Sequence, residues 1–157
     1  MAIELTPNGT LGAQPPRMPK LIFRAFMAVN VAAYHLLGTR MRPMGGYLCL
    51  VTTIGARTGK PRRTPLIAFP SGDGGWLLIA SYGGAVKHPQ WVRNLAKHPD
   101  DVILEVNGGK LILQATSLLG EERQRAWERI VAQSPRYGNY ASKTDRIIPL
   151  IRLAPRP

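Results

Sequence analysis

The sequence predicts an α+β protein built on a six-stranded, mostly antiparallel β-barrel with flanking helices. Two observations support this prediction. Apolar and β-branched runs are joined by short Gly-rich turns, which is typical of β-hairpins. Helical patterns interrupt the strands, but without the regular strand–helix alternation of a parallel sheet. With 157 residues, 45% of them hydrophobic, the chain suits one domain with a sizeable core.

The N-terminal residues 1–19 are expected to form a flexible tail, disordered or loosely attached, ahead of a single domain at 20–157. Pro, Gly and polar side chains are frequent in this tail. Because Met1 to Gln14 lacks a basic segment followed by an apolar core, we expect no secretory signal. A cytoplasmic protein is the simplest interpretation.

Lys20 to Leu37 is predicted to be a helix that stops at Gly38, and it belongs to the domain. Its surface is broadly apolar, with Lys20 and Arg24 on a narrow basic edge. Two interpretations remain open. The helix packs on the barrel or on a second subunit, which is the commoner outcome, or it lies on an anionic membrane surface. The second alternative would make the protein peripheral to the inner face of the membrane.

The strands are expected in six runs. They are Tyr47–Ile54, Thr64–Phe69, Trp76–Ser81, Val102–Val106, Lys110–Ser117 and Ile147–Leu153. Turn residues at Ser71–Gly75 and Asn107–Gly109 join the second run to the third and the fourth to the fifth as hairpins. Pro149 cannot donate a ladder hydrogen bond, so the last strand is expected at an edge.

Two further helices are expected between the strands. Pro89 suits the first position of one, which has an apolar side and ends at His98-Pro99. Glu121 and Glu122 lie in the first turn of the other, where the helix dipole favours negative charge. Pro135 breaks that helix.

The connection between the first two strands is the strongest functional signal. From Thr53 to Leu66 it reads Thr-Ile-Gly-Ala-Arg-Thr-Gly-Lys-Pro-Arg-Arg-Thr-Pro-Leu, with four cations and no carboxylate: Arg57, Lys60, Arg62 and Arg63. Gly55 and Gly59 permit tight turning and free backbone N–H groups to face a ligand. We therefore expect a site for phosphate or carboxylate groups. A solvated basic hairpin is the alternative, and the spacing is not that of a Walker loop.

Charge and the reactive residue types narrow the function. Lys and Arg number 21 against 9 Asp and Glu, and the net charge of +12 favours an acidic partner: nucleic acid, anionic lipid or a polyanionic small molecule. The single Cys49, within an apolar run, excludes an intramolecular disulfide and is expected to be a buried, inert thiol. Three histidines without ligand spacing give no metal site. No protein-only catalytic set is evident, which favours a redox enzyme with a bound cofactor.

The chain resembles the deazaflavin-dependent nitroreductase family over roughly residues 20–153. Besides the basic connection, the matching motifs are Ala80–Gly84, Lys87–Trp91, Asn94-Leu95, His98-Pro99, Tyr137, Tyr140 and Thr144–Arg146. The resemblance implies a split β-barrel that binds coenzyme F420, a deazaflavin with a phosphate and an oligoglutamate tail. It also implies hydride transfer from reduced F420 to an activated acceptor such as a quinone, an enone or a nitro compound.

The resemblance also implies roles for individual residues. The cofactor phosphate would lie against Arg57, Thr58, Gly59, Lys60 and Arg62; the deazaflavin against Thr64, Pro65, Leu66, Ser81, Gly83 and Gly84; and the tail and phosphate pocket would be completed by Lys87, Trp91 and Asn94. Tyr137, Tyr140 or Ser81 would orient the acceptor or donate a proton. Core packing remains the alternative for Trp91 and both tyrosines, and a solvated charge for Lys87.

Other functions remain as alternatives. The charge of +12 also suits a nucleic-acid- or membrane-surface-binding module, and the same barrel type could bind FMN. The cations are concentrated in a Gly-turn and no DNA- or RNA-binding motif is present, so no nucleic-acid partner is expected. We expect a small-molecule acceptor as partner, and a monomer or a homodimer.

Overall fold

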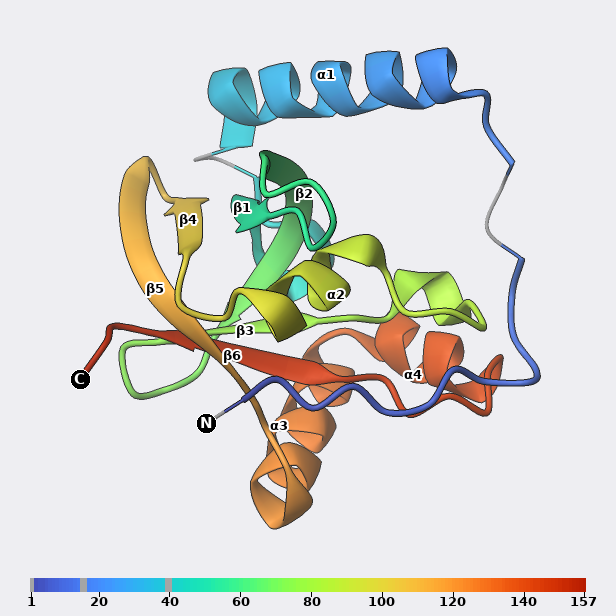
Figure 1. The fold of residues 1–157 in the computed structure, drawn as a ribbon. Coiled ribbons are helices and arrows are strands. Elements are labelled where there is room, and N and C mark those ends of the chain that lie inside the picture. Colours follow the sequence, from blue (N-terminus) through green and yellow to red (C-terminus); the bar gives the residue numbers. More distant parts are fainter. Residues whose placement is uncertain (1, 15–16, 39–40) are drawn as a thin grey trace.

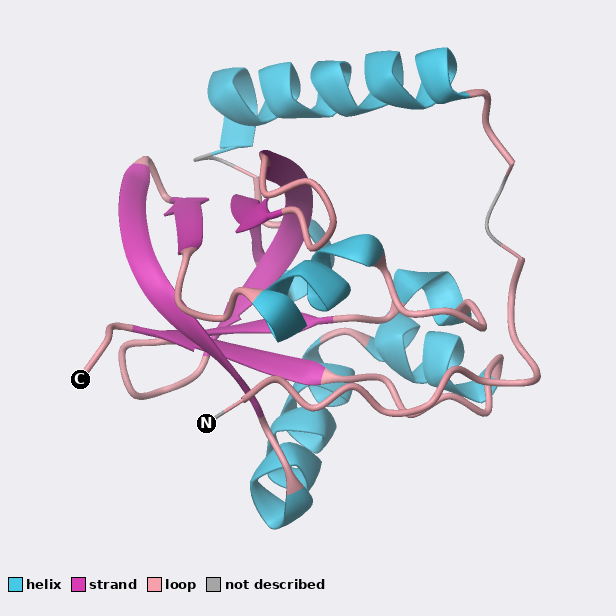
Figure 2. Cartoon of the chain, in the orientation of Figure 1, coloured by secondary structure: helices cyan, strands magenta, loops and turns pink. Residues whose placement is uncertain are grey.

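The computed structural model describes residues 2–14, 17–38 and 41–157. Six antiparallel strands close into a barrel in the order β1-β2-β3-β6-β5-β4. The strands are β1 (Tyr47–Ile54), β2 (Pro61–Pro70), β3 (Trp76–Ile79), β4 (Val102–Val106), β5 (Gly109–Ser117) and β6 (Leu150–Ala154). The helices are α1 (Lys20–Leu37), α2 (Gln90–Lys97), α3 (Gly120–Gln133) and α4 (Pro135–Ser142), with 3₁₀ turns η2 (Pro43–Gly45) and η3 (Tyr82–Gly84) (Figures 1 and 2). The α+β class and the antiparallel barrel are confirmed.

Strand β2 begins three residues earlier than the sequence predicts. Its first residues pair with the end of β1, with Thr53 opposite Arg62 and Thr52 opposite Arg63. The pairing extends the β1–β2 hairpin into the basic connection and leaves only a short turn between Ile54 and Pro61. Arg62 and Arg63 therefore lie on a paired strand, which fixes their backbone more firmly than a loop would.

The prediction of an edge position for the last strand is wrong. Strand β6 pairs with β3 on one side and with β5 on the other, and the closed barrel leaves it no free edge. Pro149 lies one residue before the strand, and its carbonyl accepts a hydrogen bond from the Ala80 N–H at 3.0 Å. Because Pro149 is outside the ladder, its missing N–H removes no strand hydrogen bond.

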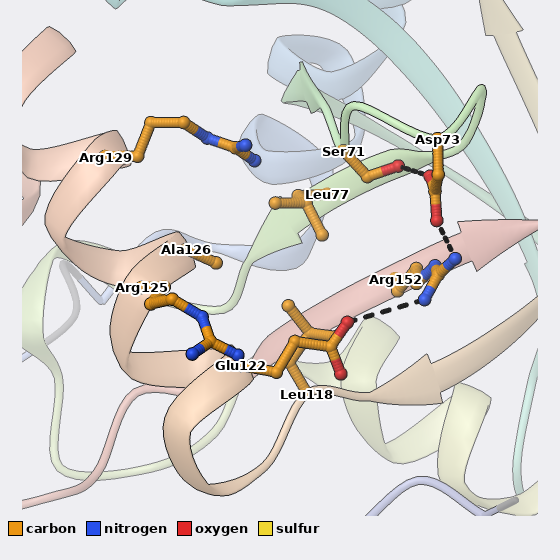
Figure 3. Close-up of a pocket in the computed structure, with 9 residues that line it drawn as sticks. All are labelled: Ser71, Asp73, Leu77, Leu118, Glu122, Arg125, Ala126, Arg129 and Arg152. Carbon is orange, nitrogen blue, oxygen red and sulfur yellow. Dashed lines mark hydrogen bonds and ion pairs between the residues drawn. The ribbon is translucent and has the colours of Figure 1, made fainter.

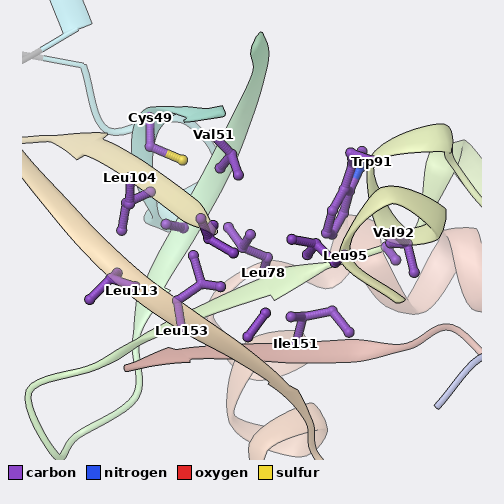
Figure 4. Close-up of a cluster of buried hydrophobic side chains, with 14 of the residues drawn as sticks. Cys49, Val51, Leu78, Trp91, Val92, Leu95, Leu104, Leu113, Ile151 and Leu153 are labelled. Atoms are coloured by element: carbon purple, nitrogen blue, oxygen red, sulfur yellow. The ribbon is translucent and has the colours of Figure 1, made fainter. Parts of the chain in front are cut away.

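The barrel interior is filled with aliphatic side chains from all six strands (Figure 4). Cys49, Leu78 and Leu104 are fully buried there, and Trp91 and Leu95 of α2 close one end. Burial raises the pKa of the Cys49 thiol to about 12, so it stays protonated at neutral pH. The expectation of a buried, inert thiol is confirmed.

A second apolar cluster lies on the outer face of β2 and β3, under α3 and α4. Leu77 and Ile79 point into it while Leu78, between them, points into the barrel, as the alternation of a strand requires. Ile130 of α3 and Tyr137 of α4 complete the cluster. It fixes α4 against the barrel and thereby places the two tyrosines of that helix.

Residues 2–14, whose composition predicts a loose tail, lie against the barrel and the C-terminal part of the chain (Figure 1). The Ile3 side chain is buried. The Gly9 N–H donates to the Val86 carbonyl at 2.9 Å, and the Asp145 carboxylate accepts hydrogen bonds from the N–H groups of Thr10 and Leu11. These partners are distant in the sequence. Residues 1, 15 and 16 of the expected tail lie outside the described ranges.

Candidate active site

A cavity of about 1020 Å³ lies between α1, the β1–β2 hairpin, the η3 loop, α2 and α4. It brings together most of the residues expected at the site: Arg57, Thr58, Arg62, Thr64, Pro65, Leu66, Ser81, Gly83, Trp91, Asn94, Tyr137 and Tyr140. Four expected residues do not line it, namely Gly59, Lys60, Gly84 and Lys87. Its size suits a large cofactor with room for an acceptor.

The basic turn at one end of the cavity is closed by its own backbone. The Gly55 N–H donates to the Lys60 carbonyl at 2.9 Å, and the Gly59 N–H donates to the Gly55 carbonyl at 2.8 Å. Gly59 has a φ of +65°, in the left-handed region that favours glycine. Lys60 and Gly59 thus shape the turn, while Arg57 and Thr58 reach the cavity wall.

Helix α2 anchors this turn through Asn94. The Asn94 side chain is buried; its Oδ1 accepts a hydrogen bond from the Ala56 N–H at 3.0 Å, and its Nδ2 donates to the Thr53 hydroxyl at 3.0 Å. The Lys97 ammonium donates to the Ala56 carbonyl at 2.9 Å. The Asn94 amide therefore holds the basic turn in place, although its side chain also borders the cavity.

The cations of the cavity have no internal counter-charge. Arg24, Arg57, Arg62 and Arg63 line it, whereas none of its lining residues is Asp or Glu. The ion pairs found among the described residues involve other arginines, at 125, 152 and 156. An anionic ligand would supply the missing charge and form charge-assisted hydrogen bonds.

The η3 loop forms a second wall with an unusual backbone. Tyr82, Gly83 and Gly84 have φ values of 47°, 63° and 80°, so three successive residues are in the left-handed region. A Cβ on Gly84 would lie 2.5 Å from the Tyr140 carbonyl oxygen, so this glycine allows the loop to approach α4. Gly84 thus lies behind the wall, while Ser81 and Gly83 line the cavity.

Tyr137 and Tyr140 lie three residues apart on α4 and both line the cavity. Their rings meet edge to face with centroids 6.0 Å apart, and the Tyr137 ring also meets Phe69 at 5.9 Å. Burial, and to a lesser degree Tyr140, raises the pKa of Tyr137 to about 12. The Tyr137 hydroxyl thus stays protonated at neutral pH and can donate a hydrogen bond.

For Trp91 and Lys87 the alternatives to ligand contact were core packing and a solvated charge, respectively. The Trp91 ring packs in the barrel core and is 5% exposed, yet it also borders the cavity. Lys87 is exposed and does not line the cavity. Both packing and ligand contact are open to Trp91, whereas the position of Lys87 is that of a solvated charge.

The sequence reasoning missed the contribution of α1. One side of this helix supplies Phe23, Arg24, Phe26, Met27 and Asn30 to the cavity. The signal was present, because these positions recur at helical spacing on one side of a helix predicted to pack on the barrel. Met44, Tyr82 and Gln90 also line the cavity. Tyr82 and Gln90 lie within motifs that carry the family resemblance, but no role was expected for either of them.

A smaller cavity of about 260 Å³ lies on the other side of the barrel, between α3 and the β2–β3 turn. Figure 3 shows Arg152 between two carboxylates, those of Asp73 and Glu122, with which it forms ion pairs. Arg125 and Arg129 of α3 reach the same cavity. Its charges are thus largely compensated within the chain.

In the described ranges no group of three or more His, Cys, Asp or Glu could hold a metal ion.

Comparison with known proteins agrees with this geometry. The family described as F420H(2)-dependent quinone reductase matches residues 22–155. An F420H(2)-dependent quinone reductase of Mycobacterium tuberculosis is 35% identical over 112 residues, which are 68% of this chain and 72% of that protein. A solved structure of an F420-H2-dependent reductase (FDR-A) is 37% identical with a TM-score of 0.62, covering 68% of this chain and 93% of that one.

A further solved structure, described as a domain-swapped dimer, is 32% identical with a TM-score of 0.63 and covers 83% of this chain and 99% of that one. The family match spans the barrel, the basic turn, the η3 loop and both tyrosines of α4, and it includes nearly all of α1. The chain therefore belongs to the F420H(2)-dependent quinone reductase family.

Proposed function

We propose that this protein reduces quinones with F420H2 and that the large cavity is its active site. The observation that supports this assignment is the chemistry of the lining, which has four arginines without a carboxylate as one part, and apolar and tyrosine side chains as the other. A cofactor with a phosphate and a polyanionic tail fits the first part, and a planar ring with an apolar acceptor fits the second.

In this proposal Arg57, Arg62 and the Thr58 hydroxyl bind the phosphate, because they lie together at the basic turn. Asn94 and Lys97 keep that turn in place through Ala56. Gly59 and Lys60 act through the turn's backbone. Lys87 has no role in cofactor binding in this proposal, whereas Arg24 of α1 contributes to the positive lining of the cavity.

When bound, reduced F420 supplies a hydride, so a quinone needs one further proton to become a hydroquinone. Tyr137 holds its proton firmly, since its pKa is about 12. We therefore assign its hydroxyl to orienting the acceptor by a donated hydrogen bond. Tyr140, which is half-buried, and Ser81 lie on the same cavity, and solvent is the simplest source of the proton.

The test is titration of the purified protein with F420, with FMN and with duplex DNA, followed by F420H2 oxidation with a soluble quinone. We expect F420 to bind most tightly, binding to weaken as salt screens the exposed arginines, and F420H2 to be oxidised only when quinone is present. Equal or tighter binding of FMN or DNA would overturn the assignment.

We further propose that α1 lies on an anionic membrane surface, which would bring lipid-soluble quinones to the cavity. The side of α1 opposite the cavity is an exposed apolar stripe: Leu21, Ala25, Val29, Ala32 and Leu36. Leu21 and Leu36 are 78% and 81% exposed. Lys20 at the start of the helix and the net charge of +12 suit anionic lipid.

By length and composition α1 is the one helix in the described ranges that could cross a membrane; its mean hydropathy is 1.3 and 6% of it is buried. Its position over the cavity favours a surface orientation over a span. Sedimentation with anionic vesicles tests this: Val29→Asp should release the protein, whereas Ile112→Asp, at an equally exposed apolar residue of β5, should not. Binding of both variants, or a dimer that dissociates only in Val29→Asp, would contradict a membrane role.

A further inference from the structure

Arg146 is a buried cation that the cavity does not use directly. It is 4% exposed and does not line the cavity. Its guanidinium donates to the carbonyls of Ala85 at 3.0 Å, Ala80 at 3.2 Å and Ser81 at 2.9 Å, and its Nη1 lies 3.1 Å from Nδ1 of His88. No ion pair to Arg146 occurs within the described ranges. The side chain thus binds both ends of the η3 loop from behind.

His88 fixes the direction of this contact. Its Nε2 lies 2.7 Å from the Thr6 carbonyl, which can only accept a hydrogen bond, so we assign the ring hydrogen to Nε2. The other ring nitrogen, Nδ1, then has a free lone pair and accepts from the Arg146 guanidinium. Every acceptor around Arg146 is therefore neutral, and the guanidinium acts as a geometric clamp.

The orientation of the loop's N–H groups follows from these carbonyls. The peptide bonds are trans, so the N–H of each following residue points away from a carbonyl that faces Arg146. The N–H groups of Ser81 and Tyr82 consequently point away from the guanidinium. The backbone hydrogen bonds in the described ranges include none donated by either group. Ser81 is in the right-handed region and Tyr82 in the left-handed region, the sequence of conformations that makes an anion-binding nest.

We propose that Arg146 is a positioning residue: it holds the η3 loop so that the N–H groups of Ser81 and Tyr82 face the cavity and bind a carbonyl oxygen of the ring or of the acceptor. This inference rests on the proposed function for the identity of the ligand. The strained φ of Tyr82 needs such a clamp, because a non-glycine residue seldom adopts this conformation unaided.

The test uses Arg146→Lys, which keeps the charge but not the planar three-carbonyl fork, and His88→Ala, which removes one contact and leaves the three carbonyls. The matched control is Arg123→Met. Arg123, which is partly buried, also donates to a backbone carbonyl, that of Ile148 at 2.7 Å, but it lies outside the cavity.

Three quantities are measured well below each variant's melting temperature: amide exchange of Gly84 and Ala85 without cofactor, the F420 dissociation constant, and kcat and KM for a quinone. The Gly84 and Ala85 N–H groups donate to carbonyls within the loop, so their exchange reports its conformation. For Arg146→Lys we expect exchange about tenfold faster and a loss of about tenfold in F420 affinity or in kcat, with a smaller change of the same kind for His88→Ala. Arg123→Met should lower the melting temperature but leave the amide exchange of the loop, the F420 affinity and the kinetics unchanged.

These measurements distinguish the two groups that the N–H groups of the loop could bind, a carbonyl oxygen of the cofactor ring or one of the acceptor. Weaker F420 binding places the ring oxygen at the nest, whereas unchanged F420 binding with lower kcat or higher KM places the acceptor there. Wild-type exchange and kinetics in both variants, or the same losses in Arg123→Met, would overturn the proposal. If the wild-type protein binds no F420 at all, the proposed function fails, while the exchange measurement still decides whether Arg146 holds the loop.

Discussion

The large cavity and the smaller one are each lined by three or more arginines, yet they differ in how those charges are balanced. In the smaller cavity Arg152 lies between Asp73 and Glu122, and all three are partly exposed. In the larger cavity the four arginines face no carboxylate. Arginines that are paired within the chain contribute to its stability, whereas unpaired arginines around a cavity are available to a ligand.

The largest effect should come from removing an unpaired cation. Arg62→Ala deletes a charge-assisted contact to the cofactor phosphate worth about 1.5–3 kcal/mol. F420 affinity should fall roughly ten- to a hundredfold, as measured by fluorescence titration. The free energy of unfolding should change by less than about 0.5 kcal/mol, because the side chain is exposed.

The matched control for Arg62→Ala is Arg125→Ala in the smaller cavity, whose arginine forms an exposed ion pair with Glu121. It should leave F420 affinity unchanged. Equal losses in the two variants would mean that overall charge, and not the position of Arg62, sets the affinity, and the contrast between the cavities would not hold.

Removing a paired cation should have the opposite outcome. Arg152→Met leaves Asp73 and Glu122 without their shared partner, and both carboxylates are partly exposed, so the cost is limited to about 1 kcal/mol of unfolding free energy. A small drop in melting temperature with unchanged F420 affinity is expected. Loss of F420 affinity in this variant would show that the smaller cavity also takes part in binding.

The protonation of Tyr137, in the large cavity, is determined by burial and not by the four arginines there. Burial raises the pKa of the phenol to about 12 and outweighs the opposing effect of Arg136, which does not line the cavity. Tyr137→Phe should therefore slow quinone reduction only a few-fold, with F420 affinity intact, since an orienting contact is lost and not a proton donor. A rate loss of a hundredfold or more would assign the proton transfer to Tyr137; Tyr140→Phe on the same helix is the companion variant.

The smallest expected effect is a dependence of stability on pH that comes from His88, the neutral hydrogen-bond partner of Arg146. Burial, outweighing the hydrogen bond to Thr6, lowers the pKa of His88, and the Arg146 charge lowers it further. The unfolded chain thus binds this proton more readily, so the stability from His88 is fully present above about pH 6.5 and is lost as pH falls toward the lower folded-state pKa. Thermal unfolding at several pH values measures it. His88→Ala should flatten this part of the profile; an unchanged slope would remove His88 as its cause.

The local signals in the sequence were sufficient for most elements. Gly-rich turns identified both expected hairpins, and the helix at Lys20–Leu37 has the predicted bounds. The edge position predicted for the last strand from Pro149 was wrong, because a proline restricts strand pairing only when it lies inside the strand. Pro149 lies just before β6, and the strand pairs on both sides in the closed barrel. Local pattern cannot reveal how a sheet closes on itself.

The candidate site likewise has one part that the sequence predicts and another that depends on the tertiary structure. The cations between Thr53 and Leu66 are adjacent in the sequence, and so their common location was predictable. Asn94 and Arg146 belonged to recognisable motifs, but their partners lie far away in the chain: Ala56 for the first, Ala80 and Ser81 for the second. Their supporting roles follow from tertiary hydrogen bonds, which no spacing in the sequence encodes.

Trp91 gives this protein a built-in optical reporter. Its indole packs among the barrel side chains on one side and borders the large cavity, whereas Trp76 and Trp127 do not line it. A ligand in the cavity would change the surroundings of this indole, so occupancy of the cavity should quench the Trp91 emission. In a Trp91→Phe variant most of that quenching should disappear, and ligand binding could then be followed through one side chain without any added dye.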